Sequence, residues 1–137
     1  DASKSRGLGD VYKRQVSIGN KKIVFFDKNT LEISQVMTFD FNVWQVTSYY
    51  NILLVSTSLN DIIVLKCDNK SDKYIYDPKL NIGLKDVCSE RIIRIGRYHE
   101  SDQCSAQLLV LNNHLHVSIG SKICVINISE LKSLSKI

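Results

Sequence analysis

The chain has 137 residues, of which 44% are hydrophobic and 23% charged, and this composition excludes disordered, collagen-like and low-complexity classes. The formal net charge is +4. No apolar run approaches the roughly 18 residues of a membrane span. We find no secretory leader, which predicts a cytoplasmic location with reduced cysteines. The chain contains two alanines and 32 β-branched residues, a bias that favours strands over helices.

The first segment of the chain has an unusual sequence. Residues 5–15 read Ser-Arg-Gly-Leu-Gly-Asp-Val-Tyr-Lys-Arg-Gln, which resembles the in-frame translation of a transposase-based sequencing adapter at all eleven codons. We therefore predict that residues 1–15 are non-native and disordered, and that the natural gene was cut upstream. Residues 1–15 contain four basic and two acidic side chains, so the native part, 16–137, has a net charge of only +2. That value is too small to predict a nucleic-acid partner.

Three segments of the native part are similar to one another. They begin at Val16, Val55 and Val117, and each has a Val-Ser strand end, a short polar turn and an apolar strand. This pattern is typical of β-hairpins. The intervals are 39 and 62 residues, and the excess of the second equals the length of a polar stretch, 68–90. Interpreted as an insertion, that stretch leaves a period of about 40 residues, the length of a four-stranded propeller blade.

The strands themselves follow from short apolar runs between turn residues. In chain order we predict strands over 34–40, 43–49, 51–56, 62–67, 91–98, 107–111, 115–119 and 122–128. The first four form one predicted unit, and the last four form its repeat. Residues 52–55, 62–65 and 108–111 are apolar at every position, which indicates burial on both faces of a sheet. The gaps are too short for the helical crossovers of a parallel sheet.

On these strand–turn–strand patterns, at 23–32, 53–65 and 115–126, the chain resembles part of a β-propeller of the WD-repeat-like kind. The Trp-Asp and Gly-His pairs of that family are absent, which leaves other propellers open, including the citron-homology type. The resemblance implies an incomplete propeller of two to three four-stranded antiparallel blades, with apolar faces and unpaired edges at both ends. A small closed β-barrel or sandwich is the alternative.

Two groups of side chains are candidates for binding a partner. Arg91, Arg94 and Arg97, followed by Tyr98, could grip an acidic or phosphorylated peptide, because arginine pairs bidentately with carboxylate and phosphate. A solvated strand edge is the simpler interpretation of the same residues. Tyr49 and Tyr50 precede a turn, and we expect both to be partly exposed.

The remaining chemistry-bearing residues predict structural roles. We expect Trp44 and Cys124 to pack in the core. The four cysteines contain no Cys-x-x-Cys pair, which argues against a zinc ribbon. His114 and His116 would share one face of a strand, but no carboxylate stands at a matching spacing, so no metal site is predicted. No nucleophile or phosphate-binding motif is present, and we predict neither enzymatic activity nor a cofactor.

These observations predict a non-catalytic scaffold for protein–protein interactions, as a fragment of a larger β-propeller protein. Its partners would be proteins, including acidic or phosphorylated peptides, and neither nucleic acid nor a membrane span is expected. Two alternatives stay open. One is a regulatory propeller domain of a multi-domain kinase, exchange factor or trafficking protein, and the other is the non-catalytic portion of a propeller enzyme.

Overall fold

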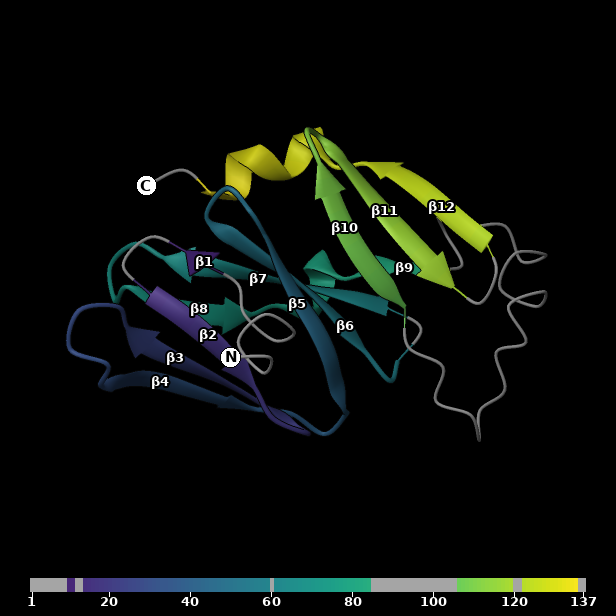
Figure 1. Ribbon diagram of the computed structural model, residues 1–137. Coiled ribbons are helices and arrows are strands. Elements are labelled where there is room, and N and C mark those ends of the chain that lie inside the picture. Colours follow the sequence, from purple (N-terminus) through teal and green to yellow (C-terminus); the bar gives the residue numbers. More distant parts are fainter. Residues whose placement is uncertain (1–9, 12–13, 60, 85–105, 120–121, 136–137) are drawn as a thin grey trace.

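The computed structural model describes residues 10–11, 14–59, 61–84, 106–119 and 122–135. Strands dominate, and they form three antiparallel sheets that follow one another along the chain (Figure 1). None of the three sheets closes on itself within the described residues. The prediction of an all-β protein is confirmed.

Each sheet is built mainly by neighbouring hairpins. Sheet A contains β1 (Asp10–Val11), β2 (Arg14–Ile18), β3 (Lys22–Asp27) and β4 (Ile33–Thr38) in that spatial order. Sheet B contains β5 (Val43–Tyr49), β6 (Ile52–Thr57), β7 (Asp61–Asp68) and β8 (Lys73–Tyr76), and β9 (Ile82–Gly83) also pairs with β7. Sheet C contains β10 (Gln107–Leu111), β11 (His114–Ile119) and β12 (Lys122–Asn127). Two 3₁₀ helices, η1 (Pro78–Leu80) and η3 (Ser129–Ser135), follow β8 and β12.

The predicted strands are present, but their grouping differs from the prediction. Seven of the eight predicted ranges correspond to observed strands, whereas 91–98 lies outside the described residues. The first predicted unit is wrong, because β4 pairs with β3 and not with β5. The connection from β4 to β5 bonds instead to the β2–β3 turn, where the N–H groups of Phe39 and Val43 donate to the carbonyls of Lys21 and Asn20. The chain therefore passes to a new sheet at this point.

The fourth strand of sheet B comes from the stretch interpreted as a polar insertion. Residues 68–90 are described up to Leu84, and they include β8, η1 and β9. In β8 the side chain of Tyr74 is buried, whereas Lys73 and Ile75 are exposed. In a strand that is covered on one face, buried and exposed side chains alternate. The composition of β8 is therefore closer to that of a loop than the compositions of β6 and β7 are, since those two strands contain continuous apolar runs.

Sheet A extends into the adapter-like segment. β1 and the first two residues of β2 lie within residues 1–15, and they form strands where disorder was expected. Arg14 and Gln15 pair with Asp27 and Phe26 of β3. Such a ladder uses backbone N–H and C=O groups, which nearly any sequence supplies. The adapter origin of this segment remains a prediction from its amino-acid sequence.

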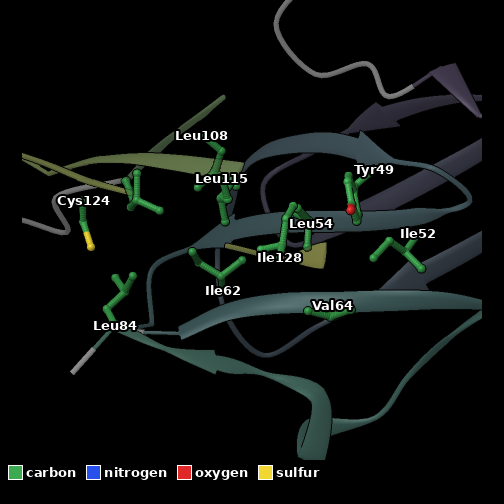
Figure 2. Close-up of a cluster of buried hydrophobic side chains, with 12 residues drawn as sticks. Tyr49, Ile52, Leu54, Ile62, Val64, Leu84, Leu108, Leu115, Cys124 and Ile128 are labelled. Carbon is green, nitrogen blue, oxygen red and sulfur yellow. The ribbon is translucent and has the colours of Figure 1, made fainter. Parts of the chain in front are cut away.

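The middle sheet is buried on both faces, as the continuous apolar runs of β6 and β7 predict. The same prediction for 108–111 is wrong, because Leu109 and Leu111 of β10 are exposed and only one face of that strand is covered. In β6 the side chains of Leu53 and Val55 pack toward sheet A, and those of Ile52 and Leu54 pack toward sheet C; all four are fully buried. Figure 2 shows the hydrophobic core between sheets B and C, which includes Leu54 and Val64 of sheet B and Leu108 and Leu115 of sheet C. Ile128, just before η3, completes this core, and Leu131 and Leu134 of η3 pack against it. Two hydrophobic cores therefore share one sheet.

The interface between sheets A and B combines stacked aromatic rings with a side-chain amide. The rings of Phe25 and Tyr74 stack with centroids 4.9 Å apart. The Gln35 side chain of β4 donates to the carbonyl of Tyr74 at 2.7 Å and accepts from its N–H at 2.9 Å. This paired bond satisfies backbone groups of β8 that face the neighbouring sheet.

The interface between sheets B and C contains the same kind of side-chain amide contact, here between the first strands of the two sheets, β5 and β10. The Gln45 side chain donates to the carbonyl of Leu108 at 2.9 Å and accepts from its N–H at 2.8 Å. The Ser56 hydroxyl donates to the carbonyl of Ala106 at 2.6 Å. A β-bulge between Val43 and Gln45 makes this possible, because it turns Val43 toward sheet A and Gln45 toward sheet C.

The β7–β8 turn provides a test of local electrostatics. The Asp68 carboxylate accepts hydrogen bonds from the hydroxyl of Ser71 at 2.7 Å and from its N–H at 3.1 Å, and these bonds lower the pKa of Asp68. The lowered pKa means that the ionised carboxylate stabilises the turn at neutral pH, and that this stabilisation is lost as the pH falls through the pKa of the folded state.

We therefore expect Ser71→Ala to move the Asp68 pKa back toward 3.8, the ordinary value for an aspartate. A carbon-detected NMR titration of the carboxyl group measures this directly. Ser71→Thr retains the hydroxyl and should leave the pKa low. An unchanged pKa in the alanine variant would contradict the assignment of the hydroxyl as the main cause.

Candidate functional site

Two tight turns meet at the same end of sheets B and C. Tyr50 and Asn51 connect β5 to β6, and Asn112 and Asn113 connect β10 to β11. The first residue of each turn has a left-handed backbone, with φ 54° at Tyr50 and 55° at Asn112. Hairpin turns with positive φ at this position favour glycine, and asparagine tolerates the conformation. A bulky tyrosine is strained there.

A cleft of about 360 Å³ lies between the two turns, lined by Ser48, Tyr49, Tyr50, Val110, Asn112 and Asn113. Tyr49 is buried, and its hydroxyl donates to Oδ1 of Asn113 at 2.8 Å. The carbonyl of Asn113 accepts from the N–H of Ile128 at 2.9 Å. These bonds join the β10–β11 turn to sheet B and to the start of η3, and so fix the walls of the cleft.

Tyr50 is the most exposed aromatic side chain of the cleft, with 62% of its surface accessible. Its ring contacts Tyr49 edge-on, with centroids 4.8 Å apart and planes at 83°. The Lys132 ammonium group of η3 lies 5.4 Å from the centre of the Tyr50 ring. One ring is thus held in a strained turn by an aromatic contact and a cation–π contact.

The cleft is lined by polar and aromatic side chains. Its lining offers phenol, hydroxyl and amide groups, with one ammonium group nearby. Such groups recognise a peptide by stacking and hydrogen bonding. In the part of the chain that the structure describes, no three His, Cys, Asp or Glu side chains are grouped to hold a metal.

The structure brings together one of the two predicted binding groups. Tyr49 and Tyr50 both line the cleft, but the expectation that Tyr49 is partly exposed is wrong, since it is 3% exposed. Its ring points between the sheets, where its hydroxyl finds Asn113. Arg91, Arg94, Arg97 and Tyr98 lie outside the described residues. The predicted strands 107–111 and 115–119 leave a turn at Asn112 and Asn113, but these two residues were not predicted to line a site, although they stand in the place of Tyr50 and Asn51 before an equivalent strand.

The residues expected in the core have different outcomes. Cys124 is buried in the core between sheets B and C, as predicted. Trp44 is only half-buried and belongs to neither core, because it is the extra residue of the β5 bulge. Its indole N–H is buried and has no hydrogen-bond partner among the residues that the structure describes. His114 and His116 share the face of sheet C that points away from sheet B. Cys88 and Cys104 lie outside the described residues.

Comparison with known proteins gives no assignment. No protein-family model matches the chain, and neither a curated protein nor a solved structure does. Among the described helices, none is long and apolar enough to cross a membrane.

Proposed function

We propose that the three sheets are consecutive blades of a β-propeller, and that the protein is a non-catalytic scaffold that binds a peptide of a partner protein in the cleft beside Tyr50. The burial of sheet B on both faces carries the structural half of this proposal. In a simple two-sheet sandwich each sheet has one buried face, whereas a propeller blade packs against a neighbour on both.

The sense of packing supports the same arrangement. In the spatial order of the strands, β3, β7 and β12 are the third strands of sheets A, B and C. Ile23 and Phe25 of β3 pack toward sheet B, and Ile62 and Val64 of β7 pack toward sheet C. Each sheet therefore presents the same face to the next sheet, which is how blades follow one another around a ring. A sandwich would instead bring like faces together.

The position and strain of Tyr50 support a binding role for the cleft. In a propeller, loops at the ends of the strands contact partners, and β5 and β10 are neighbouring first strands. Backbone strain of about 1–3 kcal/mol persists where it serves a function. Lys132 adds a positive charge that favours an acidic or phosphorylated peptide, the class that the predicted cluster of Arg91, Arg94 and Arg97 would also attract.

A substitution of Tyr50 separates folding from binding. Tyr50→Asn relieves the strained backbone but removes two ring contacts, so we expect the free energy of unfolding to stay level or rise by up to about 1 kcal/mol. Binding should fall at least about tenfold, since the exposed ring is the main apolar contact that the cleft offers. Display libraries of acidic, phosphorylated and neutral peptides identify the ligand, and calorimetry measures its affinity.

Leu31→Asn is the matched control. Leu31 is also exposed, at 66%, and also left-handed, with φ 63°, but it lies in the β3–β4 turn away from the cleft. This variant should gain stability and bind the peptide unchanged. Equal affinity in the Tyr50 variant would exclude the cleft as the site, and failure of every peptide class to bind would overturn the scaffold function.

A further inference from the structure

The open edge of β10 binds a side-chain amide at one residue and has free backbone groups two residues further along. At Leu108 the Gln45 amide donates to the carbonyl at 2.9 Å and accepts from the N–H at 2.8 Å. The N–H and C=O groups of successive strand residues point to opposite edges, so those of Val110 point to the same edge as those of Leu108. Among the described residues, neither group of Val110 on this edge has a hydrogen-bond partner.

These backbone groups lie where the cleft opens between β5 and β10. The two strands are neighbours (Figure 1), and Ser48 of β5 and Val110 of β10 both line the cleft. Gln45 spans the gap between the strands at Leu108. Thr47 is the next residue on the same face of β5, and its shorter side chain makes no hydrogen bond to the described part of β10. The gap therefore stays open at Val110, as part of the cleft of about 360 Å³.

The structure contains this kind of amide contact twice, each time on the edge of a sheet. Gln35 binds the N–H and the carbonyl of Tyr74 on β8, as Gln45 binds those of Leu108. A primary carboxamide suits such a residue, because one of its N–H groups and its C=O point in the same direction, whereas a trans peptide group points them in opposite directions. An added strand would also need the edge groups of Leu108, which Gln45 already binds. The edge at Val110 therefore favours a single carboxamide over a strand.

We propose that the peptide bound in the cleft places a glutamine or asparagine side chain between β5 and β10, where its amide donates to the Val110 carbonyl and accepts from the Val110 N–H. The proposal rests on the proposed peptide-binding function and names the residue type that this site selects. A carboxylate of the same shape cannot replace the amide, because it would set an oxygen against the Val110 carbonyl with no proton to donate. The acidic or phosphorylated residue that Lys132 favours therefore occupies another position of the same peptide.

A random peptide library selected against the full chain tests the residue preference. We expect glutamine or asparagine at one fixed position of the selected peptides. In the tightest binder, replacing that residue by methionine should weaken the affinity measured by calorimetry about tenfold, and replacing it by the matching acid should weaken it at least as much. Methylating each backbone nitrogen of the peptide in turn tests main-chain recognition. Loss of binding on methylation, with no effect of the methionine replacement, would mean that a strand pairs with β10 and would overturn the proposal.

Val110→Pro tests the same contact from the side of the protein. Proline removes the N–H of Val110 and leaves the β10–β11 ladder intact, since that N–H points away from β11. The affinity should fall about tenfold. In this variant the methionine replacement in the peptide should cost little more, because both changes remove the same contact. A backbone ester at Val110, introduced by chemical ligation, removes the N–H without fixing φ and should give the same result if the proline variant does not fold.

Val36→Pro is the matched control, because it makes the same change on the edge strand β4 of sheet A. The N–H of Phe39 points to β3, where it donates to the carbonyl of Lys21, so the alternation along β4 points the N–H of Val36 away from β3. This variant should bind the peptide with unchanged affinity.

The outcomes separate this proposal from the proposed function. Peptides selected without glutamine or asparagine, or losses in Val110→Pro and in the peptide that simply add, would overturn the carboxamide contact. If Tyr50→Asn still weakens those peptides, the cleft keeps its proposed function with a different ligand group. If no peptide binds the chain, the proposed function fails and the carboxamide contact fails with it.

Discussion

Leu54→Ala is expected to lower the free energy of unfolding by about 2–5 kcal/mol, and Leu53→Ala to do so by a similar amount. Both side chains are fully buried, yet they are neighbours on one strand that face opposite sides of sheet B. Urea unfolding of each variant measures the loss. Leu109→Ala, at a position that is 54% exposed, is the control and should change stability by no more than about 0.5 kcal/mol in the monomer.

The sheet in which amide hydrogen exchange accelerates tests the two-core arrangement more directly than the loss of stability does. The cavity left at Leu54 lies between sheets B and C, so amide hydrogen exchange should accelerate in β10 to β12. The cavity left at Leu53 lies against sheet A, so exchange should accelerate in β2 to β4. If both variants accelerate exchange in the same outer sheet, A or C, sheet B does not separate two cores.

The extent to which the sequence predicts this fold depends on how each strand is buried. The runs 52–55 and 62–65 identify β6 and β7 because both faces of sheet B demand apolar residues. The outer strand β8 was not predicted because the exposed Lys73 and Ile75 alternate with two tyrosines. Composition therefore identifies the centre of the molecule better than its rim.

The three similar segments agree in the strand after the turn, and they agree only in part in the strand before it. The apolar strands after the turn correspond in all three sheets. The Val-Ser match before the turn holds for Val55 and Val117, which both pack toward the preceding sheet, but fails for Val16, which packs toward sheet B with its partner Phe25. The β2–β3 and β6–β7 turns differ in length by one residue. One extra turn residue moves a strand to the opposite face.

The candidate site was predictable only in part. Tyr49 and Tyr50 stand out as an aromatic pair before a turn. The cleft also needs Asn112 and Asn113, which are more than 60 residues away, and Lys132 of η3. The left-handed backbone of Tyr50 has no signature in the sequence, because such a position ordinarily selects glycine or asparagine.

Gln45→Glu is expected to lower the free energy of unfolding by about 1–3 kcal/mol, because it removes the donor for a partly buried carbonyl. The side chain keeps its shape, but a carboxylate oxygen then faces the carbonyl oxygen of Leu108, where the amide now donates at 2.9 Å. Urea unfolding at pH 7 measures the loss. Gln107→Glu is the matched control, because it makes the same change at the corresponding, exposed position of sheet C and should cost little in the monomer.

The pH dependence of that loss identifies its cause. Protonation restores a donor, so the introduced carboxyl group should have a raised pKa in the folded state. The stability of the variant relative to the wild type should then be lowest above that pKa and recover as the pH falls through it. A loss that is constant from pH 7 to pH 4 would instead indicate altered packing at the bulge. Recovery at low pH would tie the contact between sheets B and C to the single hydrogen-bonded amide of Gln45.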